Sequence, residues 1–173
     1  MSCDLTYGRL EPCKNALGGI KAVLFGNFDP EGGFLPTFNG TNTDVIDSFD
    51  GAIVYKYDLI GENSFEQTIK SDRNNGTTVF EQTLKLKLKK LTPKDHKEIK
   101  LLCYGRPHVI VQDNNNNYFV CGLSRGMEVT GGTIATGTML SDFSGYTLEL
   151  KGEEKMPANF ITSISSLDVV EGV

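Results

Sequence analysis

The strictest alternation of hydrophobic and polar residues lies between residues 64 and 91. In its second half, leucine and lysine alternate: Leu84, Leu86 and Leu88 with Lys85, Lys87 and Lys89. A period of two predicts a β-strand with one apolar and one basic face. A β-type run over residues 64–70 precedes it, and the polar segment between the runs contains Asn75-Gly76, a strong hairpin signal. The pattern predicts a long antiparallel hairpin over residues 64–91, with arms that extend beyond the body of the domain.

After the hairpin, the residues favour an α-helix. Thr92 is a good N-cap, Pro93 suits a first turn, Asp95 supplies an early acid, and Gly105 stands where helices commonly end. The apolar stripe consists of Ile99, Leu102 and Cys103. We predict a short helix over residues 92–105 that covers one side of a sheet.

Most of the other apolar runs have the length and composition of strands. They are Ile20–Phe25, Ala52–Leu59, His108–Gln112, Tyr118–Leu123, Met127–Thr130, Thr133–Thr136 and Tyr146–Lys151. Gly131-Gly132 between two of them indicates a turn or a bulge. The sequence therefore predicts seven to nine strands and one helix, in a mainly β (α+β) fold: an antiparallel β-sandwich or barrel with one flanking helix.

The 173 residues suit a single domain, and three of its segments lack a regular pattern. Residues 1–19 are broken by proline and glycine and indicate an irregular N-terminal arm. Residues 160–173 indicate a C-terminal tail. Residues 28–50 indicate a long insertion loop, a kind of loop that is usually functional or ordered by a partner. Its aromatic residues are Phe28, Phe34, Phe38 and Phe49.

Charge is distributed unevenly. The chain carries a net charge of −5, yet residues 64–100 contain 9 basic and 5 acidic side chains. One explanation is that edge strands use lysine to prevent unwanted pairing. Another is that the hairpin meets an acidic surface, including that of a second copy. Nucleic-acid recognition comes third, because the chain as a whole is acidic and lacks interleaved aromatic residues.

No catalytic, cofactor or metal constellation stands out. The cysteines Cys3, Cys13, Cys103 and Cys121 form no close-spaced pair, and we expect Cys103 and Cys121 to be core thiols. We expect His96 to be solvated, and His108 not to activate Cys103, since a helix end and the next strand seldom bring the two together. No apolar run is near the ~20 residues that cross a bilayer, and the first residues lack a secretory signal. We expect a protein made in a reducing cytosol, without membrane contact, and not an enzyme.

Several blocks together resemble a known family. They are Phe80–Leu84, Leu91–Leu102, Tyr104–Val111, Val129–Ile134, Ser144–Leu148 and Pro157–Phe160. They resemble the tail-barrel or ring proteins of crAss-like short-tailed bacteriophages, which are related to phage tail-tube proteins. The resemblance covers roughly residues 5–162, and nothing is carried over to residues 28–50.

The resemblance implies a structural protein of the virion, in its tail or neck, made in the bacterial host cytoplasm. Copies would form a homo-oligomeric ring, twelve-fold by expectation, around the channel through which the genome leaves. Partners would be other copies, adjacent portal, neck or tail ring proteins, and genomic DNA that passes without sequence-specific binding through an acidic lumen. The expected subunit-interface residues are Phe65, Phe80, Lys85, Lys87, Lys89, Asn75, Gly76, Phe34 and Phe38.

An alternative function is that of a non-catalytic binding module. Aromatic loops on β-sandwiches commonly bind ligands, so residues 28–49 could take a protein or carbohydrate ligand. A loop that docks on an adjacent ring subunit explains the same residues. The two hypotheses predict different behaviour: a monomer at every concentration with a ligand-dependent melting temperature, or a self-assembling subunit.

Overall fold

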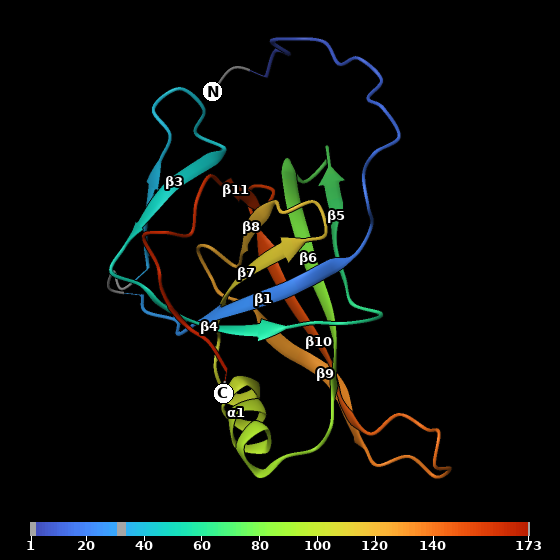
Figure 1. Ribbon diagram of the computed structural model, residues 1–173. Coiled ribbons are helices and arrows are strands. Elements are labelled where there is room, and N and C mark those ends of the chain that lie inside the picture. Colours follow the sequence, from blue (N-terminus) through green and yellow to red (C-terminus); the bar gives the residue numbers. More distant parts are fainter. Residues whose placement is uncertain (1–2, 31–33, 173) are drawn as a thin grey trace.

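The computed structural model describes residues 3–30 and 34–172 (Figure 1). It is mainly β, as expected, with twelve strands and one helix among the described residues. The strands are β1 (Ile20–Gly26), β2 (Leu35–Phe38), β3 (Val45–Asp50), β4 (Ile53–Asp58), β5 (Ser64–Asp72), β6 (Thr77–Lys89), β7 (His108–Asp113), β8 (Tyr118–Cys121), β9 (Glu128–Ala135), β10 (Gly145–Glu154), β11 (Asn159–Ile161) and β12 (Asp168–Val170), and the helix is α1 (Pro93–Tyr104).

The strands form two sheets in a sandwich-like arrangement that is not a closed barrel. The larger sheet has the order β12-β4-β1-β7-β8-β11-β3-β2, and the smaller has the order β5-β6-β10-β9. All pairs in the smaller sheet are antiparallel. In the larger sheet, β11–β3 and β12–β4 are parallel. The prediction of a mainly antiparallel sandwich is confirmed.

Two apolar cores explain why the central strands are hydrophobic on both faces. One core lies between the sheets and includes Val23, Val111, Leu86 and Leu148. The other lies on the opposite face of the larger sheet, where Leu24 and Ile110 alternate with the first set. A strand between two cores has no polar face, so β1 and β7 appear in the sequence as continuous apolar runs.

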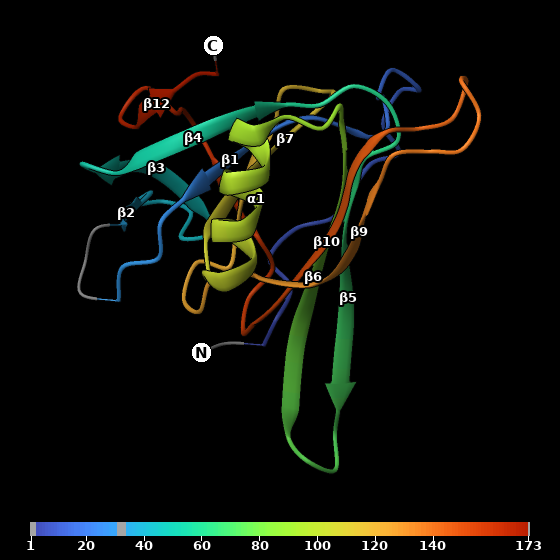
Figure 2. The ribbon, with the colours of Figure 1, turned by 90° about the horizontal axis from the view of Figure 1, so that it is seen from below.

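The predicted hairpin is confirmed as β5 and β6. Its register runs from Ser64 opposite Lys85 to Asp72 opposite Thr77. The inner part of β6 pairs with β10, from Lys89 opposite Gly145 to Phe80 opposite Glu154. Beyond this point β5 and β6 pair with no other described strand, and Figure 2 shows their tip projecting past the rest of the molecule.

The predicted helix is also confirmed. The hydroxyl of Thr92 accepts a hydrogen bond from the Asp95 backbone N–H at 3.1 Å, and the Gly105 N–H donates to the Leu101 carbonyl at 3.0 Å. Gly105 is extended rather than left-handed. Of the expected stripe, Ile99 is buried and Leu102 half-buried, but Cys103 is exposed. No helix among the described residues is long and apolar enough to cross a bilayer.

Three sequence-based expectations need correction. Residues 28–50 are not one long loop, because β2 and β3 pair there at one edge of the larger sheet. The tail from residue 160 contributes β11 and β12 to the same sheet. The strand number is twelve rather than seven to nine among the described residues, since four strands of three to six residues were too short to give a pattern.

Candidate self-assembly surface

The basic face of the hairpin points away from both cores. Leu84 and Leu86 are buried against the larger sheet, which turns Lys85, Lys87 and Lys89 to the opposite face. The Lys87 ammonium lies 4.6 Å from the centre of the Phe143 ring. Within residues 3–30 and 34–172 these three lysines form no ion pair, and Glu149, opposite Lys85 in the ladder, pairs with Lys151 at 3.2 Å. Their charge is therefore available to a partner.

The apolar face of the hairpin continues past the core into solvent. Phe65 is half-buried and packs against the core, with its ring centre 6.4 Å from that of Phe119. Phe80 stands directly opposite Ile69 in the ladder. Ile69 is 66% exposed. The expected contact residue Phe80 is itself half-buried, and the sequence pattern did not point to its exposed apolar partner Ile69.

The hairpin tip is held by local hydrogen bonds. Asp72 accepts from the backbone N–H of Asn74 at 2.8 Å, and the Asn75 side-chain amide donates to the same carboxylate at 2.7 Å. Gly76 has a φ of 64°, the left-handed conformation that glycine adopts without strain. Asn75 and Gly76 thus fix the shape of an exposed polar tip. Their expected role in a subunit contact stays a prediction.

The smaller sheet ends in two open edges. Among the described residues, β5 pairs only with β6, and β9 pairs only with β10. The two edge strands have nine and eight residues. An edge strand exposes a row of unpaired backbone donors and acceptors, a template for pairing with another chain.

The aromatic residues of segment 28–50 mostly face inward. Phe34 is 7% exposed and stacks on the His108 ring at 4.6 Å between centres, and Phe49 is buried beside it. This corrects the expected interface role of Phe34 and weakens the case for an aromatic ligand loop. Phe38 is 42% exposed, and its expected role in a subunit contact stays a prediction.

His108 has a structural environment, not a catalytic one. Its Nδ1 donates to the Gly122 carbonyl at 2.8 Å, which leaves Nε2 buried without a partner among the described residues. Burial lowers the pKa of His108, while the Gly122 carbonyl, Glu154 and Asp29 act in the opposite direction. The imidazole is therefore held neutral between the rings of Phe34 and Phe28.

Of the two cysteines expected in the core, Cys103 and Cys121, the expectation is confirmed for Cys121 and wrong for Cys103. Cys121 is buried, which raises the pKa of its thiol, whereas Cys103 is exposed because it lies on the solvent side of α1. Within the described part of the chain, no group of three His, Cys, Asp or Glu side chains could hold a metal ion.

A second projecting element was not predicted. The connection between β9 and β10, residues 136–144, exposes Met139 and Leu140. Asp142 accepts from the backbone N–H groups of Thr138 at 3.0 Å and Met139 at 2.8 Å, and these bonds lower the pKa of its carboxyl. The loop is thus shaped by its own hydrogen bonds while its apolar side chains face solvent. The segment has no hydrophobic periodicity, so its sequence did not predict a projecting loop.

Comparison with family models, curated proteins and solved structures gave no match to the chain.

Proposed function

We propose that this protein is a structural subunit that assembles head to tail into a closed ring. The observation that carries the proposal is the pair of open edges on the smaller sheet. Strands β5 and β9 have similar lengths and bound opposite sides of that sheet. A surface that is complementary to a different surface of the same molecule makes a ring when the rotation per subunit closes.

The strand directions of the smaller sheet suit such a junction. Each strand is antiparallel to its neighbour, so β5 and β9 run in opposite directions. If β9 of one subunit lies beside β5 of the next, the alternation continues across the boundary. The junction would satisfy the free backbone groups of both edges and join the smaller sheets into one continuous sheet.

The face of this sheet turned away from the core would then line or brace the channel, except where Lys85, Lys87 and Lys89 meet an acidic neighbour. Its lysines are interspersed with carboxylates, and several form ion pairs, such as Lys70 with Glu81 and Lys151 with Glu149. A face of mixed charge offers DNA no continuous basic track. This supports passage of DNA without sequence-specific binding, although the lumen would be mixed in charge rather than acidic.

The resemblance to phage ring proteins supports a location for this assembly in the tail or neck of a virion. A ring in the tail or neck of a short-tailed phage would stack on a portal or tail protein and surround the genome during ejection. The projecting β5–β6 hairpin and the loop 136–144 are suited to contacts with such neighbours, because both extend from the body (Figures 1 and 2).

Charged substitutions at the two edges test the proposal. Ile69 in β5 and Ile134 in β9 are 66% and 56% exposed, so Ile69→Lys and Ile134→Lys should leave the fold intact. Each variant should remain monomeric, since an edge lysine opposes pairing. Ile60→Lys is the control, because Ile60 is 77% exposed but lies outside the sheets. Normal assembly of both edge variants, measured by sedimentation velocity, would refute the edge-to-edge junction.

A further inference from the structure

The N-terminal arm, residues 3–16, exposes its large apolar side chains. Every residue of the arm is exposed, and Leu5, Tyr7 and Leu10 are each at least 90% exposed. A row of such side chains in water indicates a surface that a partner covers. Figure 1 shows the arm leaving the body at the end opposite α1.

The base of the arm is clamped to the body. The Asn115 side chain exchanges hydrogen bonds with the backbone of Leu17, both at 2.8 Å. The Asn114 side-chain amide donates to the Gly18 carbonyl at 2.6 Å. These side chains reproduce a strand pairing at the point where the arm leaves the sheet.

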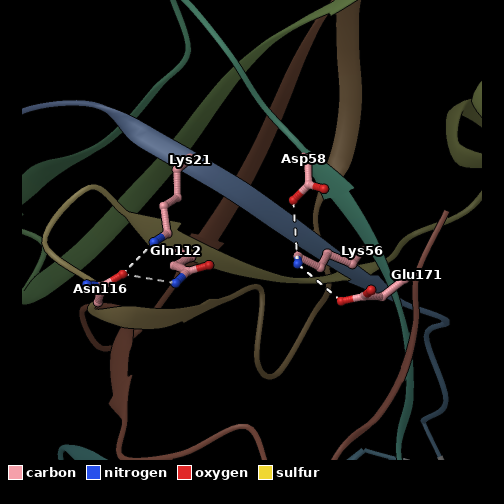
Figure 3. Close-up of polar contacts among 6 residues, drawn as sticks. All are labelled: Lys21, Lys56, Asp58, Gln112, Asn116 and Glu171. Atoms are coloured by element: carbon pink, nitrogen blue, oxygen red, sulfur yellow. Dashed lines mark hydrogen bonds and ion pairs between the residues drawn. The ribbon is translucent and has the colours of Figure 1, made fainter.

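The clamp is itself held in place. Asn116, in the same loop, accepts from the Lys21 ammonium at 2.5 Å and from the Gln112 amide at 3.4 Å (Figure 3). Lys21 and Gln112 belong to β1 and β7, the central strands of the larger sheet. The direction in which the arm departs is therefore fixed by the body, while the side chains of the arm stay exposed.

A groove at the end of the molecule opposite the arm is lined partly by exposed apolar side chains. It lies between α1 and β4 and consists of two adjoining hollows of about 410 and 790 Å³, which share Tyr55, Tyr57 and Glu98. Leu101 of α1 lines it and is 52% exposed. We call this the α1–β4 groove.

The groove is acidic by a small margin, because its lining contains four acidic side chains and three basic ones: Asp58, Asp95, Glu98 and Glu171 against Lys56, Lys94 and Arg106. Arg106 is itself paired with Glu128 at 3.4 Å, outside the groove. Lys56 lies between Asp58 at 3.5 Å and Glu171 at 3.3 Å, which neutralises much of their charge (Figure 3). Asp95 and Glu98 form no ion pair with any described residue. Burial raises the pKa of Tyr57 in the groove, and the charges of Glu98 and Asp95 raise it further. The groove suits a ligand that is apolar and basic.

We propose that the arm of one subunit docks in the α1–β4 groove of a second copy, with Leu5 and Tyr7 on the apolar wall and Arg9 beside Glu98. The inference rests on the proposed self-assembly and names one of its contacts. In an extended segment Leu5, Tyr7 and Arg9 share one face. Four steps of ~3.3 Å give about 13 Å, which fits along a twelve-residue helix of about 18 Å.

Other occupants fit less well. The groove of the same subunit lies at the opposite end of the molecule from the arm (Figure 1). A nucleic acid would meet the unpaired carboxylates of Asp95 and Glu98. The existing Arg9–Glu11 ion pair, 3.8 Å long between exposed side chains, is of the kind that contributes little and would exchange readily.

Disulfide trapping tests the contact. In a full chain with Cys3, Cys13 and Cys103 changed to Ser, Tyr7→Cys and Leu101→Cys are introduced together. Mild oxidation should give covalent dimers and a ladder of longer chains on a non-reducing gel. Tyr7→Cys with Leu140→Cys is the matched control, since Leu140 is fully exposed on another projecting element. Equal cross-linking of test and control, no cross-linking, or a disulfide within one chain would each overturn the proposal.

The same experiment separates this contact from the ring. Closed rings in an electron micrograph without the Tyr7–Leu101 cross-link would overturn the arm contact and leave the ring standing. A cross-linked ladder in a preparation that never forms rings would keep the arm contact and refute the ring.

A charge exchange gives an independent readout. Arg9→Glu or Glu98→Arg alone should lower the yield of the Tyr7–Leu101 cross-link at least several-fold, and the two together should restore it. No recovery in the double variant would overturn the pairing of Arg9 with Glu98.

Discussion

His108 shows how one buried side chain ties stability to pH. In the unfolded chain His108 takes up a proton near pH 6.5. Burial lowers the pKa of His108 in the folded chain, so its imidazole is still neutral at that pH. The unfolded state therefore binds more protons below pH 6.5, and stability falls as the pH drops toward the lowered pKa of the folded state.

We expect this loss to reach at most about 1.4 kcal/mol per pH unit from His108. Urea titrations between pH 7.5 and 5 would measure it. His108→Gln keeps a donor for the Gly122 carbonyl but cannot take up a proton, so its stability should depend less steeply on pH. An equally steep dependence in that variant would show that other groups are responsible.

Gly132 is required by its backbone. Its φ is 154°, and a Cβ there would lie 2.2 Å from the Thr147 carbonyl oxygen in β10. We expect Gly132→Ala to lower the free energy of unfolding by about 2 kcal/mol or more. Gly131→Ala is the matched control, because a Cβ at Gly131 meets nothing within 4 Å. Equal unfolding midpoints for the two variants would contradict this account.

At the scale of the elements, the hairpin and the helix could be predicted because their signals are local. The alternation of leucine and lysine predicted strand β6, and Thr92 predicted the start of helix α1. Strands β11 and β12 could not be predicted, since each has three residues and pairs with a strand more than a hundred residues earlier. The apolar run at residues 20–25 likewise predicted a strand but not which elements cover its two faces.

On the candidate self-assembly surface, too, only the features that have a local sequence pattern could be predicted. The period of two placed Lys85, Lys87 and Lys89 on one face, and the structure agrees. Phe34 was misplaced because an aromatic residue in an irregular segment gives no sign of the direction it faces. Leu101 and Ile69 were missed because their exposure depends on how distant elements pack.

The lysines on the basic face of β6 are predicted to be required for assembly. Changing Lys85, Lys87 and Lys89 together to Glu should block assembly, since the expected acidic neighbour would then be repelled. The fold should survive, with at most about 1 kcal/mol lost where Lys87 lies over Phe143. Light scattering measures the assembly and circular dichroism the unfolding.

A control with the same charge change makes this test specific. Lys90, Lys97 and Lys100 are exposed outside the β6 ladder, and their change to Glu should not affect assembly. If the β6 variant assembles as well as the control, the electrostatic part of the interface is wrong.

At the scale of the whole molecule, the proposed assembly uses two pairs of surfaces. Among the described residues the smaller sheet has one free edge at β5 and another at β9, and we propose the α1–β4 groove as the counterpart of the apolar arm. Each member of a pair lies on a different part of the molecule. Heterologous contacts of this kind propagate in one direction around a ring, so in the proposed ring every copy would use all four surfaces.

The mass of the particles tests this account most directly. Size-exclusion chromatography with light scattering, over a range of concentrations and with negative-stain imaging of each peak, gives both the stoichiometry and the shape. We expect one dominant assembly of uniform mass, seen as closed rings with a central channel. Monomers at every concentration, or open chains of variable length, would contradict the proposal that the chain closes into a ring.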